Sequence, residues 1–145
     1  MTPQEIQAAV SADPALQALV AAGDFAAVAA ALSLGRTKVA SHFASERGIL
    51  ERYPHGPIAA DELLAALEAF ADTAHPMARI VGRALKFLAQ PEGLDIGSPA
   101  TQGLLDQLMA GGVISQAQRD GLRAMATVAD VVTWPQVQAA MQGGN

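Results

Sequence analysis

The chain has no cysteine, which excludes several kinds of site, and few aromatic residues, which limits how its core can be built. Without a thiol among its 145 residues, it can form no disulfide, cysteine-ligated zinc site, iron–sulfur cluster or thiol-dependent active site. Hydrophobic residues make up 51% of the chain but aromatic residues only 4%, and many of the former are alanine. Because alanine buries little area, the core must come from the Leu, Ile, Val, Met and Phe positions.

Positive charge and long apolar runs are also scarce. Nine Lys and Arg residues stand against fourteen Asp and Glu residues, so the net charge is −5. This balance argues against a nucleic-acid partner, which would require concentrated positive charge. No apolar run approaches the roughly 20 residues of a membrane span, and the N-terminus lacks the basic segment of a signal peptide. We therefore expect no membrane partner and a location in a cytoplasm or in a particle assembled there.

Signals for the start of a helix recur along the whole chain. A polar or turn residue precedes proline at 2–3, 13–14, 56–57, 75–76 and 98–99. Proline suits the first helical position because its missing N–H would have no partner there. Capping boxes, in which a Ser or Thr and a Glu or Gln three residues later bond each other's backbone, add starts at 2–5, 115–118 and 133–136.

These signals predict an all-α fold, a compact bundle of about seven to nine short helices in a single domain, 1–145. We expect an N-terminal helical layer over 1–32, an irregular connecting segment over about 33–56 and a helical core over 57–142.

Within the irregular segment, glycine and proline interrupt the hydrophobic pattern. Residues 37–39 are expected to be briefly extended, and 48–53 to form a helical turn or two. The segment also holds four of the nine basic residues of the chain, at positions 36, 38, 47 and 52.

The two helices expected after residue 57 carry opposite charges. Over 58–73 the acidic residues lie mostly opposite the apolar stripe, whereas Arg79, Arg83 and Lys86 form a basic stripe on the next helix. This arrangement predicts an antiparallel helix pair with complementary outer faces.

No cluster of residues carries an evident reaction. The histidines His42, His55 and His75 lack the spacing of a metal site, and Ser41 beside His42 lacks a third catalytic partner. The segment 35–38 (GRTK) lacks the upstream glycine of a phosphate-binding loop. We therefore expect a protein that is not an enzyme and that holds no metal or cofactor.

Residues 25–43 resemble a helix-turn-helix, and this keeps one alternative open. Ala29 takes the close-contact position, and Arg36 and Lys38 would face a major groove from a recognition helix. Ser33 in place of the usual turn glycine and the acidic net charge argue against it. A small DNA-binding regulator that uses 25–43 is the resulting alternative function.

Six segments follow one another along most of the chain: 12–16 (ADPAL), 29–38 (AAALSLGRTK), 48–51 (GILE), 94–98 (LDIGS), 104–108 (LLDQL) and 112–115 (GVIS). In these segments the chain resembles small uncharacterised all-α proteins encoded in the virion and tail gene modules of tailed bacteriophages and prophages of Proteobacteria.

The resemblance implies a structural or accessory component, such as a virion or tail protein, that acts by protein–protein contact. Its partners would be other phage structural proteins or further copies of the chain in a homo-oligomer. Its location would be the virion or the cytoplasm of the bacterial host. A phage-encoded inhibitor of a host protein is a second alternative, and no catalytic residue is implied.

On this interpretation, the irregular segment is the candidate binding region. Loops on a rigid helical scaffold commonly carry contacts, and Arg and Tyr side chains commonly anchor them. The candidate protein-binding residues are Arg36, Lys38, Arg47, Arg52 and Tyr53.

Overall fold

The computed structural model describes residues 1–143 and contains nine α-helices and four short strands in that range. The protein is mostly all-α, which confirms the predicted fold class, and the helix number matches the expected seven to nine. The residues group in two compact units. Unit 1 holds Met1–Lys38 and the residues from Ala129 on, and unit 2 holds Val39–Val128.

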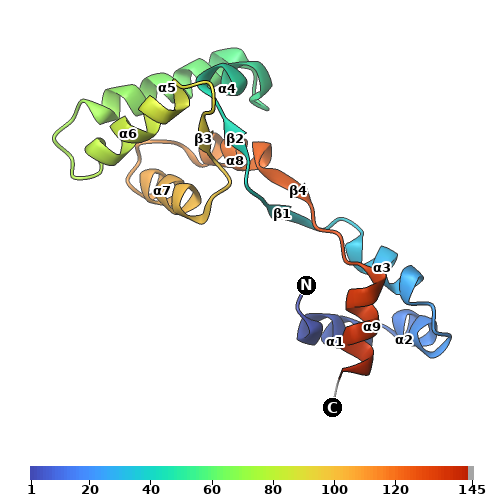
Figure 1. The fold of residues 1–145 in the computed structure, drawn as a ribbon. Coiled ribbons are helices and arrows are strands. Elements are labelled where there is room, and N and C mark those ends of the chain that lie inside the picture. The colour runs from blue at the N-terminus through green and yellow to red at the C-terminus, as the bar shows by residue number, and fades with distance from the viewer. Residues whose placement is uncertain (144–145) are drawn as a thin grey trace. The chain divides into compact units, whose positions relative to one another are not determined.

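Unit 1 is built from helices at both ends of the chain. Its core contains Ile6, Val10, Val28 and Val137, and α9 packs against both α1 and α3 (Figure 1). The Gln7 side chain adds a hydrogen bond from α1 to the Ala140 carbonyl of α9, with an N–O distance of 2.6 Å. The helices are α1 (Pro3–Ala12), α2 (Pro14–Ala21), α3 (Phe25–Ser33) and α9 (Trp134–Gln142).

The helix starts of unit 1 follow the local sequence. Thr2 and Glu5 form the predicted capping box of α1. The carboxylates of Asp13 and Asp24 accept hydrogen bonds from backbone N–H groups in the first turns of α2 and α3. Each bond satisfies a donor that has no partner inside its helix, so these starts could be predicted from residues within one turn.

Unit 2 contains five helices in its described residues, and they enclose a second core. Leu63 and Leu64 of α5 and Val81 of α6 pack there with Leu105 of α7 and Leu122 of α8. The core keeps a small apolar cavity of about 40 Å³. The helices are α4 (Glu46–Arg52), α5 (Pro57–Ala71), α6 (Ala78–Leu88), α7 (Pro99–Ala110) and α8 (Gln116–Met125).

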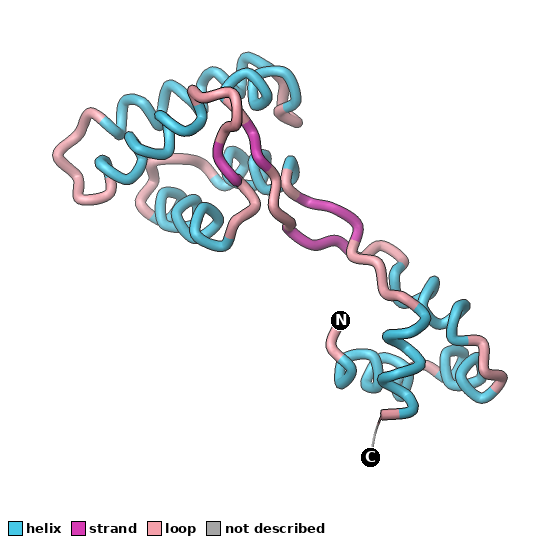
Figure 2. The backbone as a smooth tube through the Cα atoms, viewed as in Figure 1, coloured by secondary structure: helices cyan, strands magenta, loops and turns pink. Residues whose placement is uncertain are grey.

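Two small sheets complete the structure. In unit 2, β2 (Phe43–Ala44) pairs antiparallel with β3 (Leu94–Asp95), as the tube in Figure 2 shows. The chain passes from unit 1 to unit 2 within β1 (Thr37–Val39) and returns within β4 (Thr127–Ala129). These two strands also pair with each other.

The structure differs from the sequence-based predictions in three respects. A single domain was predicted, whereas the structure forms two compact units, because α9 joins the N-terminal helices. The segment 33–56 is less irregular than predicted, since it holds α4 as well as β1 and β2, although the extended stretch 37–39 is confirmed. Helix α6 begins at Ala78 rather than after His75, whose Nδ1 accepts a hydrogen bond from the Met77 N–H in the preceding turn.

The first prediction concerns Gly97, where two backbone segments of unit 2 approach each other closely. A Cβ atom at Gly97 would overlap the carbonyl oxygen of Ala40. We expect Gly97→Ala to lower the free energy of unfolding by about 3 kcal/mol, the upper end of the cost of overpacking. Equilibrium unfolding in urea measures the change.

The control is Gly103→Ala within α7, where a Cβ atom would meet nothing within 4 Å. This variant should raise the free energy of unfolding by about 0.5–1 kcal/mol, because alanine is the better helix former. Equal stability of the two variants would contradict the close approach at Gly97.

Candidate protein-interaction surface

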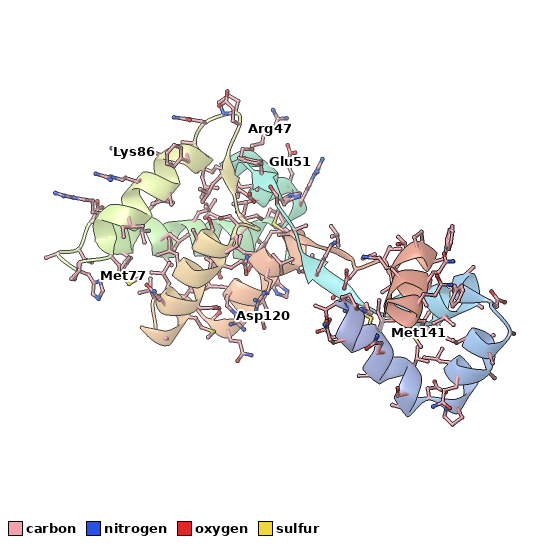
Figure 3. All side chains as sticks on the ribbon, turned by 60° about the horizontal axis from the view of Figure 1, so that its bottom comes forward. Arg47, Glu51, Met77, Lys86, Asp120 and Met141 are labelled. Carbon is pink, nitrogen blue, oxygen red and sulfur yellow. The ribbon has the colours of Figure 1, made fainter. Side chains whose placement is uncertain are left out.

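Helix α4 positions the most accessible of the predicted binding residues. The Ser45 hydroxyl caps its start by accepting a hydrogen bond from the Gly48 N–H at 3.1 Å. Ile49, 1% exposed, fixes the helix to the core, where α4 packs against α5. Arg47 and Glu51, one turn apart, project from α4 and form an ion pair of 2.8 Å (Figure 3).

The strand before α4 presents an exposed phenylalanine. In the antiparallel pair of β2 and β3, Ala44 lies opposite Leu94 and Phe43 lies opposite Asp95. Successive side chains of a strand point to opposite faces. Ala44 is therefore buried in the core, whereas Phe43 keeps 65% of its surface exposed.

Asp95 fixes the loop that leads to Phe43. Its carboxylate accepts hydrogen bonds from the Ser41 hydroxyl at 2.7 Å, the His42 N–H at 2.8 Å and the Gly97 N–H at 3.0 Å. The bond from Ser41, followed by those from the backbone, lowers the pKa of Asp95 because all of them favour the charged carboxylate. The loop before β2 is thus held to the turn after β3.

Phe43 and α4 together border a hollow of about 240 Å³. We define the α4 surface as Phe43, Arg47, Glu51, Arg52 and Met125, all of which line this hollow. The Arg47 side chain is 86% exposed, and the hydrogen bond from Arg47 lowers the pKa of Glu51. An ion pair this exposed opens at little cost, so both groups are available to a partner.

The five predicted binding residues do not form one site. Arg36 and Lys38 belong to unit 1, where Asp130 holds them at 2.9 and 3.8 Å. Arg47 and Arg52 belong to unit 2 and contribute to the α4 surface.

The interpretation of Tyr53 as an exposed anchor needs correction. Tyr53 is 5% exposed, and its hydroxyl donates a hydrogen bond to the Gln118 carbonyl at 3.3 Å. Burial raises the pKa of this hydroxyl. A Cβ atom at Gly121 would overlap the Tyr53 ring, so the aromatic side chain fills a space left open by glycine. Tyr53 is part of the core because it follows the last turn of α4 on the side that faces α8.

The sequence-based prediction did not include Phe43, Glu51 and Met125 of the α4 surface, nor Asp95, which fixes the loop before Phe43. A strand of two residues is too short to show an alternating pattern, so nothing local marked Phe43 as exposed. Asp95 receives its hydrogen bonds from residues more than fifty positions away as well as from its own turn. The only local signal was the Asp–X–Gly turn 95–97, which fits a carboxylate that bonds a backbone N–H two residues on.

The segment required by the helix-turn-helix alternative is not helical. Residues 37–39 form β1, and β2 begins at Phe43. Ser33, at the end of α3, accepts a hydrogen bond from the Val132 N–H at 2.9 Å and lies 2.7 Å from the Ala29 carbonyl. The chain after α3 therefore pairs with the segment before α9 instead of forming a recognition helix.

Within residues 1–143, no group of three or more His, Asp or Glu side chains is placed to hold a metal ion. None of the helices described there has the length and apolar character needed to cross a membrane. Comparison of the chain with protein-family models, curated proteins and solved structures finds no match.

The second prediction tests the structural role of Tyr53. Replacing a buried aromatic residue by alanine leaves a cavity, so Tyr53→Ala should lower the free energy of unfolding by about 3–5 kcal/mol. Tyr53→Phe keeps the ring and loses only the hydrogen bond to Gln118, which contributes about 0.5–1.5 kcal/mol. Thermal and urea unfolding compare the two variants. A stable Tyr53→Ala protein would restore Tyr53 as a candidate surface anchor.

The third prediction concerns Asp95 and pH. Because its pKa is lower in the folded than in the unfolded state, Asp95 stabilises the fold above the pKa of an unfolded aspartate, about 3.9. This contribution is lost as the pH falls through the lowered pKa of the folded state. Asp95→Asn should therefore lower the Tm at neutral pH, and its difference from the wild type should shrink in acid.

A pH series of thermal unfolding checks this expectation, with Asp61→Asn as the control. Asp61 is an exposed acid of α5 whose carboxylate accepts no hydrogen bond from residues 1–143. An Asp95→Asn protein with the same Tm as the wild type at neutral pH would show that these hydrogen bonds contribute nothing.

Proposed function

We propose that the chain is a structural or accessory protein of the tailed-phage type, a virion or tail component, and that it acts by protein–protein contact through the α4 surface. We infer the contact from one observation, the exposed Phe43 beside the arginines of α4. The phage assignment is supported by the sequence resemblance of six segments that span most of the chain. Binding, rather than catalysis, is the activity proposed.

Phe43 is suited to anchor a partner. Fully burying a side chain of this kind contributes about 1.5–3 kcal/mol, and 65% of Phe43 is still exposed to solvent. Aromatic residues and arginine are enriched at the centres of protein interfaces. The pairing of β2 with β3 and the hydrogen bonds of Asp95 already fix the loop, so binding would cost little additional ordering.

The charged side chains indicate the chemistry of the partner surface. Arg52 forms no ion pair with any residue of the described part of the chain, and Arg47 is held only by the exposed Glu51. Guanidinium groups bind carboxylates through two parallel hydrogen bonds. We therefore infer a partner that presents an apolar pocket for Phe43, bordered by Asp or Glu side chains.

The fourth prediction tests this function in virus particles. Mass spectrometry of particles purified from a strain that encodes the chain should find the protein in stoichiometric amounts. Phe43→Ala should reduce its incorporation by about 30-fold, the equivalent of a 2 kcal/mol interface anchor. Because Phe43 is exposed, the Tm should change little.

The control is Gln107→Ala on α7, an exposed residue outside the α4 surface, which should leave incorporation unchanged. Absence of the wild-type protein from particles would overturn the virion role and favour the inhibitor of a host protein. Presence of the Phe43→Ala protein at the wild-type level would instead show that contact is made elsewhere.

A further inference from the structure

The exposed face of α5 carries the acidic residues of the expected helix pair. The acidic residues exposed on this face are Asp61, Glu62, Glu68 and Asp72, the last of which is the C-terminal cap of α5. Ala65, which lies between them, is also exposed. Ile58, at the start of the same face, is 77% exposed, and no other large hydrophobic residue of unit 2 is more exposed. Spacings of three and four residues place these side chains on one stripe of the helix.

The exposed face of α6 shows the opposite charge. Arg79, Arg83 and Lys86 are exposed, and Ile80 and Phe87, one heptad apart, retain 55% and 51% of their surfaces. Lys86 projects outward from α6 in Figure 3.

An apolar hollow of about 230 Å³ lies beside this face. Its lining includes Ile80, Phe87, Leu94 and Leu104, with Arg83 also present. The face of α6 thus combines a hollow that can accept an apolar side chain with a row of cations next to it.

The charges of the two helices do not neutralise each other within the chain. Helices α5 and α6 lie side by side (Figure 1) and pack through their buried faces, with Leu63, Leu67 and Val81 in the shared core. None of the ion pairs within residues 1–143 joins an acid of α5 to a cation of α6. Both exposed faces are therefore available to another molecule.

We propose that the α6 face is a docking site for the α5 face of a second copy of this chain. Ile58 of one copy would enter the hollow beside Phe87 of the other, and the acids of α5 would lie along Arg79, Arg83 and Lys86. The contact is separate from the α4 surface, so it goes beyond the proposed function and does not depend on it.

The dimensions of the two faces support a second copy as the occupant. At a rise of about 1.5 Å per residue, the cations of α6 extend over about 10 Å and the acids of α5 over about 16 Å. The row of cations is therefore short enough to lie entirely along the row of acids.

The chemistry of the two faces is also matched. Each combines charge of one sign with exposed apolar side chains, and an exposed isoleucine on one corresponds to an apolar hollow in the other. Complementary charge of this kind favours the correct pairing of surfaces and speeds their encounter.

The fifth prediction is salt-sensitive self-association of the full chain. Exposed ion pairs contribute only about 0.2–1 kcal/mol each, so we expect weak association that needs a concentration series up to about 0.5 mM. Sedimentation velocity at low salt should show oligomers in this series. In 1 M salt, where the screening length is about 3 Å, the oligomers should dissociate.

Charge reversal identifies the faces. The double variants Arg79→Glu/Arg83→Glu and Glu62→Lys/Glu68→Lys should each weaken self-association by about tenfold or more, the effect of losing roughly 1.4 kcal/mol. A mixture of the two variants should associate again, because each supplies the charge that the other lacks. Ile58→Ser should also weaken association, and circular dichroism verifies that every variant is folded.

The matched control is Arg47→Glu/Arg52→Glu, which changes the net charge as much as the α6 variant but alters the α4 surface. It should self-associate like the wild type, and its incorporation into particles should fall if the α4 surface binds the partner. A wild-type chain that stays monomeric throughout, or oligomers that survive both reversals, would overturn the proposal. So would binding of the α6 face to anionic vesicles by a chain that remains monomeric.

Discussion

Helix α9 completes the core of unit 1, and the path of the whole chain depends on that packing. Val137 and Ala140 of α9 are almost fully buried among residues of α1 and α3. The chain must therefore return from unit 2 before it ends, which it does within β4. Asp130, just after this return, binds the Arg36 side chain at 2.9 Å, and its N–H donates to the Arg36 carbonyl. The outgoing and returning segments thus hold each other where unit 1 closes.

Unit 2 depends on a contact of the same kind. Asp95 in the turn after β3 binds the segment before β2, and the Ile96 N–H donates to the His42 carbonyl. A carboxylate with several donors stays charged and needs no positive partner, which suits a chain with few cations. This arrangement places Phe43 on the surface while its neighbour Ala44 is in the core. The exposure of Phe43 is therefore a consequence of the fold around it, not of its own sequence context.

The parts of the fold that could be predicted are those decided within one helical turn. The capping residues Thr2, Asp13, Asp24, Ser98 and Ser115 make their hydrogen bonds within three positions, so the sequence alone indicated the helices they start. By contrast, the division into two units, the two small sheets and the burial of Tyr53 depend on contacts between residues far apart in the sequence. The candidate site was predicted only in part for the same reason, since Arg47 and Arg52 reach the surface whereas Tyr53 enters the core.

The charged faces of α5 and α6 show how sequence and structure contribute to one inference. The sequence established the opposite charges of the two helices, but such charges are commonly used within a chain to set the register of a helix pair. In the structure these helices pack through leucine and valine, and the acids and cations are exposed on separate faces. A chain that needed only a stable helix pair would gain little from leaving three neighbouring cations and two large apolar side chains exposed on α6. An intermolecular contact accounts for both the charges and the apolar residues, because the exposed pattern on α5 is its complement.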